Sequence, residues 1–157
     1  MGIRSRRFHG RGPYMIDCPY DCGGYENGLI LCRPAGILTP ETIDHFLACR
    51  DQLEEEAGKP LDRFIDMRKV TGIELGYQHT SRFAEAMANR AQGKRIVMAC
   101  FLVVNEVQYG MARMYQALVD GRGLEVHISY EVEELARILG VPDFILLGEQ
   151  PPSEPSE

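Results

Sequence analysis

IVMACFLVV, from Ile96 to Val104, is an uninterrupted run of nine apolar residues between a basic pair and a polar pair. The run is too short to cross a bilayer as a helix, which takes about 20 apolar residues. Its Ile, Val, Phe and Cys residues favour a β-strand over a helix. Because no polar residue alternates with them, the run predicts a strand buried on both faces, in the middle of a sheet that helices cover.

The segments around this run alternate between strand and helix patterns. Further strands are expected at 29–33, 61–67 and 124–130, and the turn signal Asn27-Gly28 pairs the first of them with a preceding edge strand. Strands that alternate with helices imply a largely parallel sheet with right-handed crossovers. The predicted fold is therefore an α/β domain with a mixed, mostly parallel central sheet of about five strands, flanked by about four helices.

The helix boundaries follow from capping signals. Thr39 caps a first helix that begins at Pro40 and ends at Gly58, and Asn105 caps a third helix with Gln108 placed as in a capping box. The second helix is expected to open at 79 or 80 and the fourth to cover 131–139, with 144–147 packed as an extension. Residues 70–76 are expected to form a loop, and the acidic triplet 54–56 to be a solvated patch.

The chain of 157 residues is 45% hydrophobic, which suits one domain with a sizeable core. We expect a disordered basic arm at 1–13, a single α/β domain at 14–148 and a disordered, acidic, Pro-rich tail at 149–157. The net charge of −6 argues against a dedicated nucleic-acid binder. No segment has the length and composition of a signal or a membrane span, so we expect a cytoplasmic protein with no integral membrane segment.

Five cysteines, an odd number that includes Cys100 inside the apolar run, fit reduced intracellular thiols. Cys18 and Cys22 are the one close pair, with C-x-x-x-C spacing. A metal or redox role for this pair stays open, but no second Cys or His pair has the spacing of a zinc site. We therefore expect no metal and no cofactor.

Ligands in such sheets bind beyond the carboxyl ends of the strands. Two polar segments follow predicted strands there, one after Asp66 and one at Asn105. We call this edge of the sheet the rim. We expect it to bring together a carboxylate, a guanidinium, an imidazole and an amide. The residues expected to bind a ligand or partner there are Asp66, Arg68, Thr71, Glu74, His79 and Asn105.

Each of these residues also has a structural interpretation. Asp66 is either a general base or the ion-pair partner of Arg68, and His79 is either a catalyst or a residue at a helix start. The standard hydrolase, nucleotide-binding and metalloprotease motifs are absent from the sequence, so no catalytic residue is assigned. Met87, Met98, Met111 and Met114 have the spacing of packing residues, and lining a pocket for an apolar ligand is the alternative.

Two stretches resemble the STAS fold. ENGLILCRPAGILT, at 26–39, is similar to its opening strand and turn into the first helix, and FIDMRKV, at 64–70, is similar to its hydrophobic-Asp-Leu-x-x-Val strand. YGMARMY, at 109–115, and the helix at 132–139 are similar to a bacterial, anti-sigma-factor-antagonist-like branch of the group. The resemblance covers about residues 26–140 and implies a regulatory or interaction module.

The phosphorylation loop of the anti-sigma-factor antagonists is not reproduced. Its Asp-Ser-Ser-Gly motif would fall on Glu74-Leu75-Gly76-Tyr77, where no serine stands, and Thr80 and Ser81 are the next hydroxyl residues. The leading hypothesis is a non-catalytic regulatory module that binds a protein partner or forms a homodimer. The alternatives are a binder of a small apolar or anionic ligand at the rim, and an enzyme that uses Asp66, His79 and Arg68.

Overall fold

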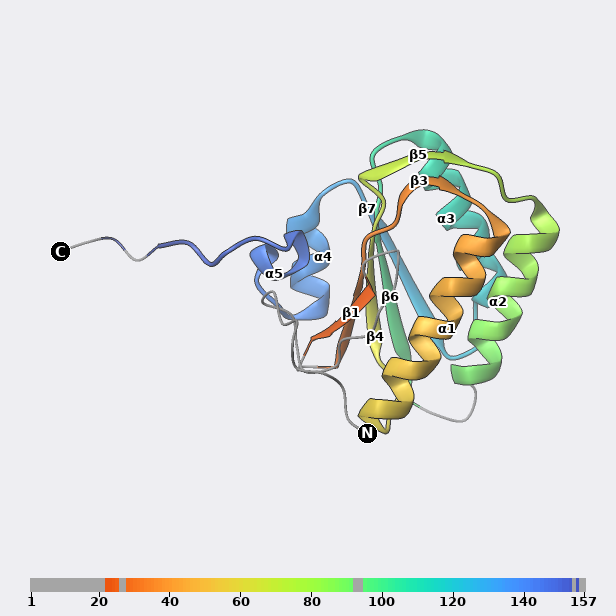
Figure 1. Ribbon diagram of the computed structural model, residues 1–157, viewed down its shortest axis with the longest axis horizontal. Helices are drawn as coiled ribbons and strands as arrows, with labels where there is room; N and C mark the ends of the chain where they lie inside the picture. The colour runs from red at the N-terminus through yellow and green to blue at the C-terminus, as the bar shows by residue number, and fades with distance from the viewer. Residues whose placement is uncertain (1–21, 26–27, 92–94, 154, 156–157) are drawn as a thin grey trace.

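The structure, a computed structural model, describes residues 22–25, 28–91, 95–153 and 155. They form three layers, in which helices cover both faces of a central sheet (Figure 1). The predicted basic arm at 1–13, and Cys18 with it, lie outside the described residues. None of the helices in the described ranges is long and apolar enough to cross a membrane.

The central sheet has five strands in the order β1-β2-β4-β6-β7. They are β1 (Cys22–Tyr25), β2 (Leu29–Cys32), β4 (Asp62–Asp66), β6 (Val97–Leu102) and β7 (Leu124–Ser129). β1 runs antiparallel to β2, and all other neighbours are parallel. This confirms the predicted class, a mixed and mostly parallel α/β fold.

β6 is buried on both faces, as the apolar run predicts. Val97, Ala99 and Phe101 belong to the hydrophobic cluster on one side of the sheet. Cys100 and Leu102 belong to the cluster on the other side. Burial raises the pKa of the Cys100 thiol to about 12, so this cysteine is an inert part of the core.

The ends of the run differ from its centre. Ile96 and Val104 are 63% and 50% exposed, and lie outside the strand. β6 is an interior strand between β4 and β7, but the middle strand of the five is β4. The prediction that β6 is the middle strand is therefore wrong by one position, because β7 alone lies beyond β6 at that edge of the sheet.

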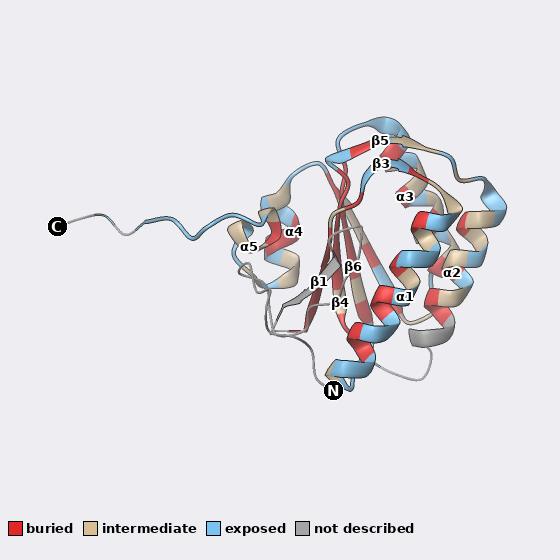
Figure 2. Cartoon of the chain, in the orientation of Figure 1, coloured by how far each residue is buried: buried red, intermediate tan, exposed pale blue. Residues whose placement is uncertain are grey.

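Three helices cover one face of the sheet, and two shorter helices cover the other (Figure 1). The first group is α1 (Pro40–Ala57), α2 (Tyr77–Ala91) and α3 (Glu106–Val119), and the second is α4 (Val132–Leu139) and α5 (Asp143–Leu147). Buried residues concentrate on the strands and on the helix sides that face them (Figure 2). The larger hydrophobic cluster lies under α1, α2 and α3.

The predicted start and end of α1 are confirmed. Thr39 Oγ1 accepts from the Thr42 amide at 3.4 Å, and Thr42 Oγ1 accepts from the Thr39 amide at 3.1 Å, which forms a reciprocal capping box. Gly58 ends the helix in the left-handed conformation with φ 73°. These contacts fix where α1 begins and ends.

The loop prediction for 70–76 is wrong in part. β5 (Lys69–Ile73) pairs in parallel with β3 (Ala35–Leu38) and forms a separate two-stranded sheet beyond the carboxyl ends of the main strands (Figure 1). Gly72 and the exposed polar residues of β5 interrupt any apolar pattern, so these short strands give no clear signal in the sequence.

The account of β6 is tested by a charge in its buried centre. In the wild type the Phe101 ring packs against Tyr115, with 5.6 Å between the ring centroids. Phe101→Asp should lower the free energy of unfolding by about 4 kcal/mol or more, because it buries an unpaired carboxylate. Ile96→Asp, at an exposed end of the same run, should change it by less than about 0.5 kcal/mol. Urea unfolding followed by circular dichroism measures both; equal effects would contradict the placement of β6.

Candidate functional site

The predicted rim is organised around the buried carboxylate of Asp66, at the end of β4. Arg68 Nε lies 3.0 and 3.1 Å from its two oxygens and Arg68 Nη2 lies 2.7 Å from Oδ2, so the pair is bidentate. The Arg68 amide donates to Oδ1 at 3.0 Å as well. Hydrogen bonding to Asp66 raises the pKa of the Arg68 guanidinium. The carboxylate is thus held in a fixed ion pair.

Arg33, the residue after β2, joins this pair to the layer of α4 and α5. Its Nε lies 3.9 Å from Asp66 Oδ2, and its Nη2 donates to the carbonyl oxygen of Leu146, near the end of α5. Gly148 packs against the guanidinium so closely that a Cβ there would lie 3.2 Å from Nη2. Asp66 and Arg33 therefore connect two strands with α5, which is a structural role.

The other predicted rim residues form separate local contacts. Thr71 and Glu74 are exposed, and the Glu74 amide donates to Leu38 at 2.7 Å. His79 Nδ1 accepts from the Gly76 amide at 3.2 Å, in the first turn of α2. As a general acid or base, His79 would need a carboxylate within hydrogen-bond reach to orient it. Within the described ranges no hydrogen bond or ion pair joins His79 to a carboxylate.

Asn105 caps α3 as predicted, since its Oδ1 accepts from the Gln108 amide at 2.9 Å. The Gln108 side chain does not complete a capping box. It is buried, accepts from the Val104 amide at 2.9 Å and donates to the carbonyl oxygens of Met67 at 3.1 Å and Val70 at 3.3 Å. Gln108 thus ties the end of β6 to the β4–β5 turn, a role that the capping pattern in the sequence concealed.

Apolar and aromatic side chains are exposed where β6 and β7 end. Val104, Val107 and Tyr130 are 50%, 69% and 51% exposed. The Tyr130 ring stacks on Tyr109 of α3 with a centroid separation of 5.7 Å and an interplanar angle of 7°. We call these four residues, Val104, Val107, Tyr109 and Tyr130, the rim patch.

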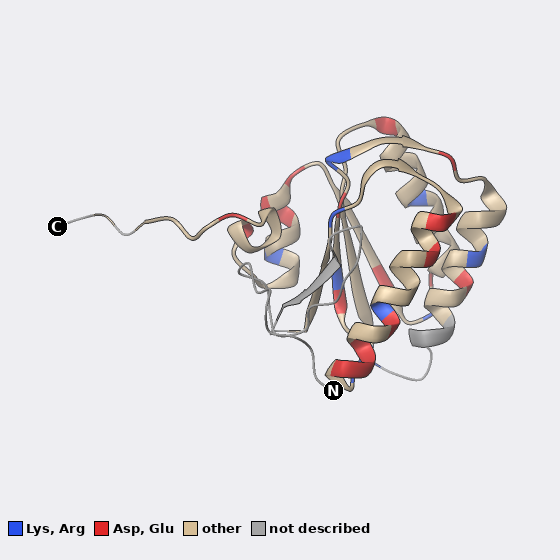
Figure 3. Ribbon diagram, viewed as in Figure 1, with Lys and Arg blue, Asp and Glu red and all other residues tan. Residues whose placement is uncertain are grey.

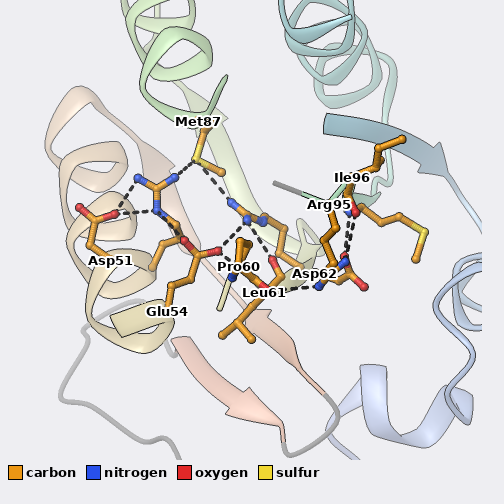
Figure 4. A network of polar contacts seen from close by, with 11 residues as sticks. Asp51, Glu54, Pro60, Leu61, Asp62, Met87, Arg95 and Ile96 are labelled. Carbon is orange, nitrogen blue, oxygen red and sulfur yellow. Dashed lines mark hydrogen bonds and ion pairs between the residues drawn. The ribbon is translucent and has the colours of Figure 1, made fainter. Parts of the chain in front are cut away.

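A network of buried charges under α1 was not predicted (Figure 4). Glu54 Oε2 accepts from Arg63 Nη2 at 3.1 Å and from the Leu61 amide at 2.8 Å. Arg50 lies 2.7 Å from Asp51 and 3.8 Å from Glu54. The prediction of a solvated triplet is wrong for Glu54, because a helix turns its fourth residue after Arg50 to the same, buried face.

A cavity of about 70 Å³ adjoins this network, between the sheet and α1, α2 and α3. Its walls are mostly apolar and include Phe46, Ile65, Met67, Phe83, Phe101 and Met111. Arg63 and Tyr115 are its buried polar residues with orphaned atoms: Arg63 Nε and Tyr115 Oη have no hydrogen-bond partner. Of the four methionines with packing spacing, Met87 and Met111 line the cavity, whereas Met98 and Met114 do not.

Comparison with protein-family models, with curated proteins and with solved structures found no match for this chain. The described residues contain no group of three His, Cys, Asp or Glu side chains arranged to hold a metal ion. The rim has exposed apolar side chains, and the cavity has buried polar atoms without a partner, so each has a feature that could bind a partner or a ligand.

The structural role of Asp66 is tested by Asp66→Ala. It should lower the free energy of unfolding by about 2–3 kcal/mol, because it leaves Arg33 beside α5 without its carboxylate. Glu74→Ala, an exposed acid on the same rim, should cost less than about 0.5 kcal/mol. Thermal and urea unfolding of both variants give the comparison, and a stable Asp66→Ala protein would contradict this role.

The buried network offers a test with two adjacent residues. Glu54→Gln should lower the free energy of unfolding by about 3 kcal/mol, because the Arg50 and Arg63 guanidinium groups lose a buried carboxylate. Glu55→Gln should change it by less than about 0.5 kcal/mol, because Glu55 is exposed. Equal unfolding midpoints for the two variants would show that Glu54 is solvated after all.

Proposed function

We propose that this protein is a non-catalytic, STAS-like regulatory module that binds a protein partner through the rim patch. The observation that carries the proposal is the exposure of Val104, Val107 and Tyr130 beside a closed ion pair. Val104 and Tyr130 follow the neighbouring strands β6 and β7, and Val107 lies in the first turn of α3, so all three are at one edge of the sheet. Exposed apolar side chains grouped at one edge of a globular domain are typical of an interaction site. A tyrosine held by stacking, as Tyr130 is on Tyr109, suits an interface anchor because it loses little conformational freedom on binding.

The contacts of Asp66 and His79 at the rim favour a binding role over a catalytic one. Both oxygens of Asp66 are engaged by Arg68, so neither is positioned to take a proton from a substrate. His79 accepts from the backbone of its own helix start. A cytoplasmic location is part of the proposal and is supported by the odd number of cysteines.

The partner is expected to be a different protein with an apolar centre and a basic border. Acidic residues adjoin the rim patch along the chain, and Glu106, Glu131 and Glu133 are exposed. Figure 3 colours acidic positions of the ribbon red at the starts of α3 and α4, near the rim. A second copy of the patch would bring acid against acid, whereas a basic surface would complement it.

The proposal is tested by affinity capture from a cell lysate with wild type and two charge variants. Val107→Glu, in the rim patch, should weaken the captured complex at least about tenfold, because it places a carboxylate in the apolar contact. Ile96→Glu is the matched control, since Ile96 is 63% exposed, close to the 69% of Val107, but lies at the other end of β6 from the rim. Native mass spectrometry of the purified protein reports self-association in parallel.

A protein retained by wild type and Ile96→Glu but lost with Val107→Glu, and shown to bind again when purified, supports the proposal. If Val107→Glu captures the same proteins as wild type, the proposal is contradicted. It is also contradicted if the protein is a monomer and captures no partner. A dimer that Val107→Glu dissociates would replace the hetero-partner with a second copy of the chain.

A further inference from the structure

We propose that the cavity between the sheet and α1, α2 and α3 binds a small, mostly apolar molecule that carries one hydrogen-bond-accepting oxygen. The warrant is the combination of apolar walls with two buried polar atoms, Arg63 Nε and Tyr115 Oη, that have no partner in the protein. This inference goes beyond the proposed function, because it involves none of the four residues of the rim patch.

Both orphaned atoms can donate a hydrogen bond, and Tyr115 Oη can also accept one. Arg63 and Tyr115 are 3% and 2% exposed, so bulk water does not satisfy them. Burial raises the pKa of Tyr115 to about 12, which keeps the phenol protonated at neutral pH. A buried donor without an acceptor is costly, and a ligand oxygen would remove that cost. A bound water would accept from the donors but leave its own hydrogens facing mostly apolar walls.

The neighbouring donors are also weakly satisfied. Arg50 Nη1 lies 2.8 Å from the Met87 sulfur, and Arg63 Nη1 lies 3.6 Å from the same atom. A thioether is a poor acceptor for a guanidinium. Met87 lines the cavity as well, so this end of the cavity has an excess of donors over good acceptors. An accepting oxygen would therefore meet these guanidinium donors better than the Met87 sulfur does.

The size of the cavity limits the ligand. A cavity of about 150 Å³ holds benzene, so about 70 Å³ encloses about three non-hydrogen atoms, and the rest of a longer ligand would extend into the opening of the cavity. Ile43, Leu75 and Phe83 are half-buried lining residues, which places the approach from solvent between α1, α2 and the β5–α2 connection. Short-chain ketones, amides and carboxylic acids have the required size and oxygen.

The test is nuclear magnetic resonance of the full chain labelled with ¹³C at the methionine methyl groups. The probes are 2-pentanone, butyrate and 2-methyl-1-pentene, which have nearly the same size and differ in their oxygen. We expect 2-pentanone or butyrate to shift the signals of Met67, Met87 and Met111, which line the cavity. Met98 and Met114 do not line it and should stay unmoved.

The contribution of the ligand oxygen to binding is tested by comparing the three probes and two variants of the protein. The better oxygenated probe should bind at least about fivefold more tightly than the hydrocarbon. Tyr115→Phe should remove most of that difference and leave hydrocarbon binding unchanged. Ala99 lines the cavity, so Ala99→Val should reduce the cavity volume and weaken the binding of all three probes. Dispersed methyl signals in both variants show that they remain folded.

Each outcome decides the proposal. Selective shifts at the three cavity methionines, with preference for an oxygenated probe, support it, and the better of butyrate and 2-pentanone tells whether that oxygen is charged. Equal binding of the hydrocarbon and both oxygenated probes overturns the role of the oxygen. Absence of any shift, or equal shifts at Met98 and Met114, overturns the site.

Discussion

The ion pair between the buried carboxylate of Glu54 and Arg63 is the interaction on which the face covered by α1, α2 and α3 depends. Arg50 and Arg63 place two guanidinium groups under α1, where an unpaired charge would be strongly unfavourable. Glu54 meets Arg63 at 3.1 Å and also accepts from the Leu61 amide at 2.8 Å. One side chain thereby fixes the last turns of α1, the α1–β4 connection and the start of β4.

This constraint explains why a cavity lies beside the network. The Arg63 guanidinium must stay within reach of Glu54, so its position is set by the ion pair and not by apolar packing. Its Nε is buried without a partner, and Arg63 lines the cavity from the sheet side together with Ile65 of β4 and Phe101 of β6. Tyr115 contributes its hydroxyl from α3 while its ring packs on Phe101. The cavity is thus polar at a few fixed points and apolar elsewhere, as small-molecule sites generally are.

The sequence predicted the features that local patterns encode. The apolar run at 96–104 predicted a buried β6, and Thr39 and Asn105 predicted the starts of α1 and α3. Glu54 was not distinguishable from its exposed neighbour Glu55 without the register of α1 against the sheet. Gln108 satisfied a capping pattern but turned inward to the β4–β5 turn. The pairing of Asp66 with Arg68 was one of two interpretations, and the cavity depends on packing between helices, which residue spacing does not reveal.

Helix α3 connects the two places where binding is proposed. Val107 and Tyr109 belong to the rim patch, and Met111 and Tyr115, one and two turns further on, line the cavity. The most direct test of this account is a high-resolution crystal structure of the protein pressurised with xenon, which enters empty apolar cavities. The account predicts a xenon atom among Ile65, Phe101 and Met111, with Glu54 still bonded to Arg63. Side chains that fill this space and leave no bound xenon would contradict it.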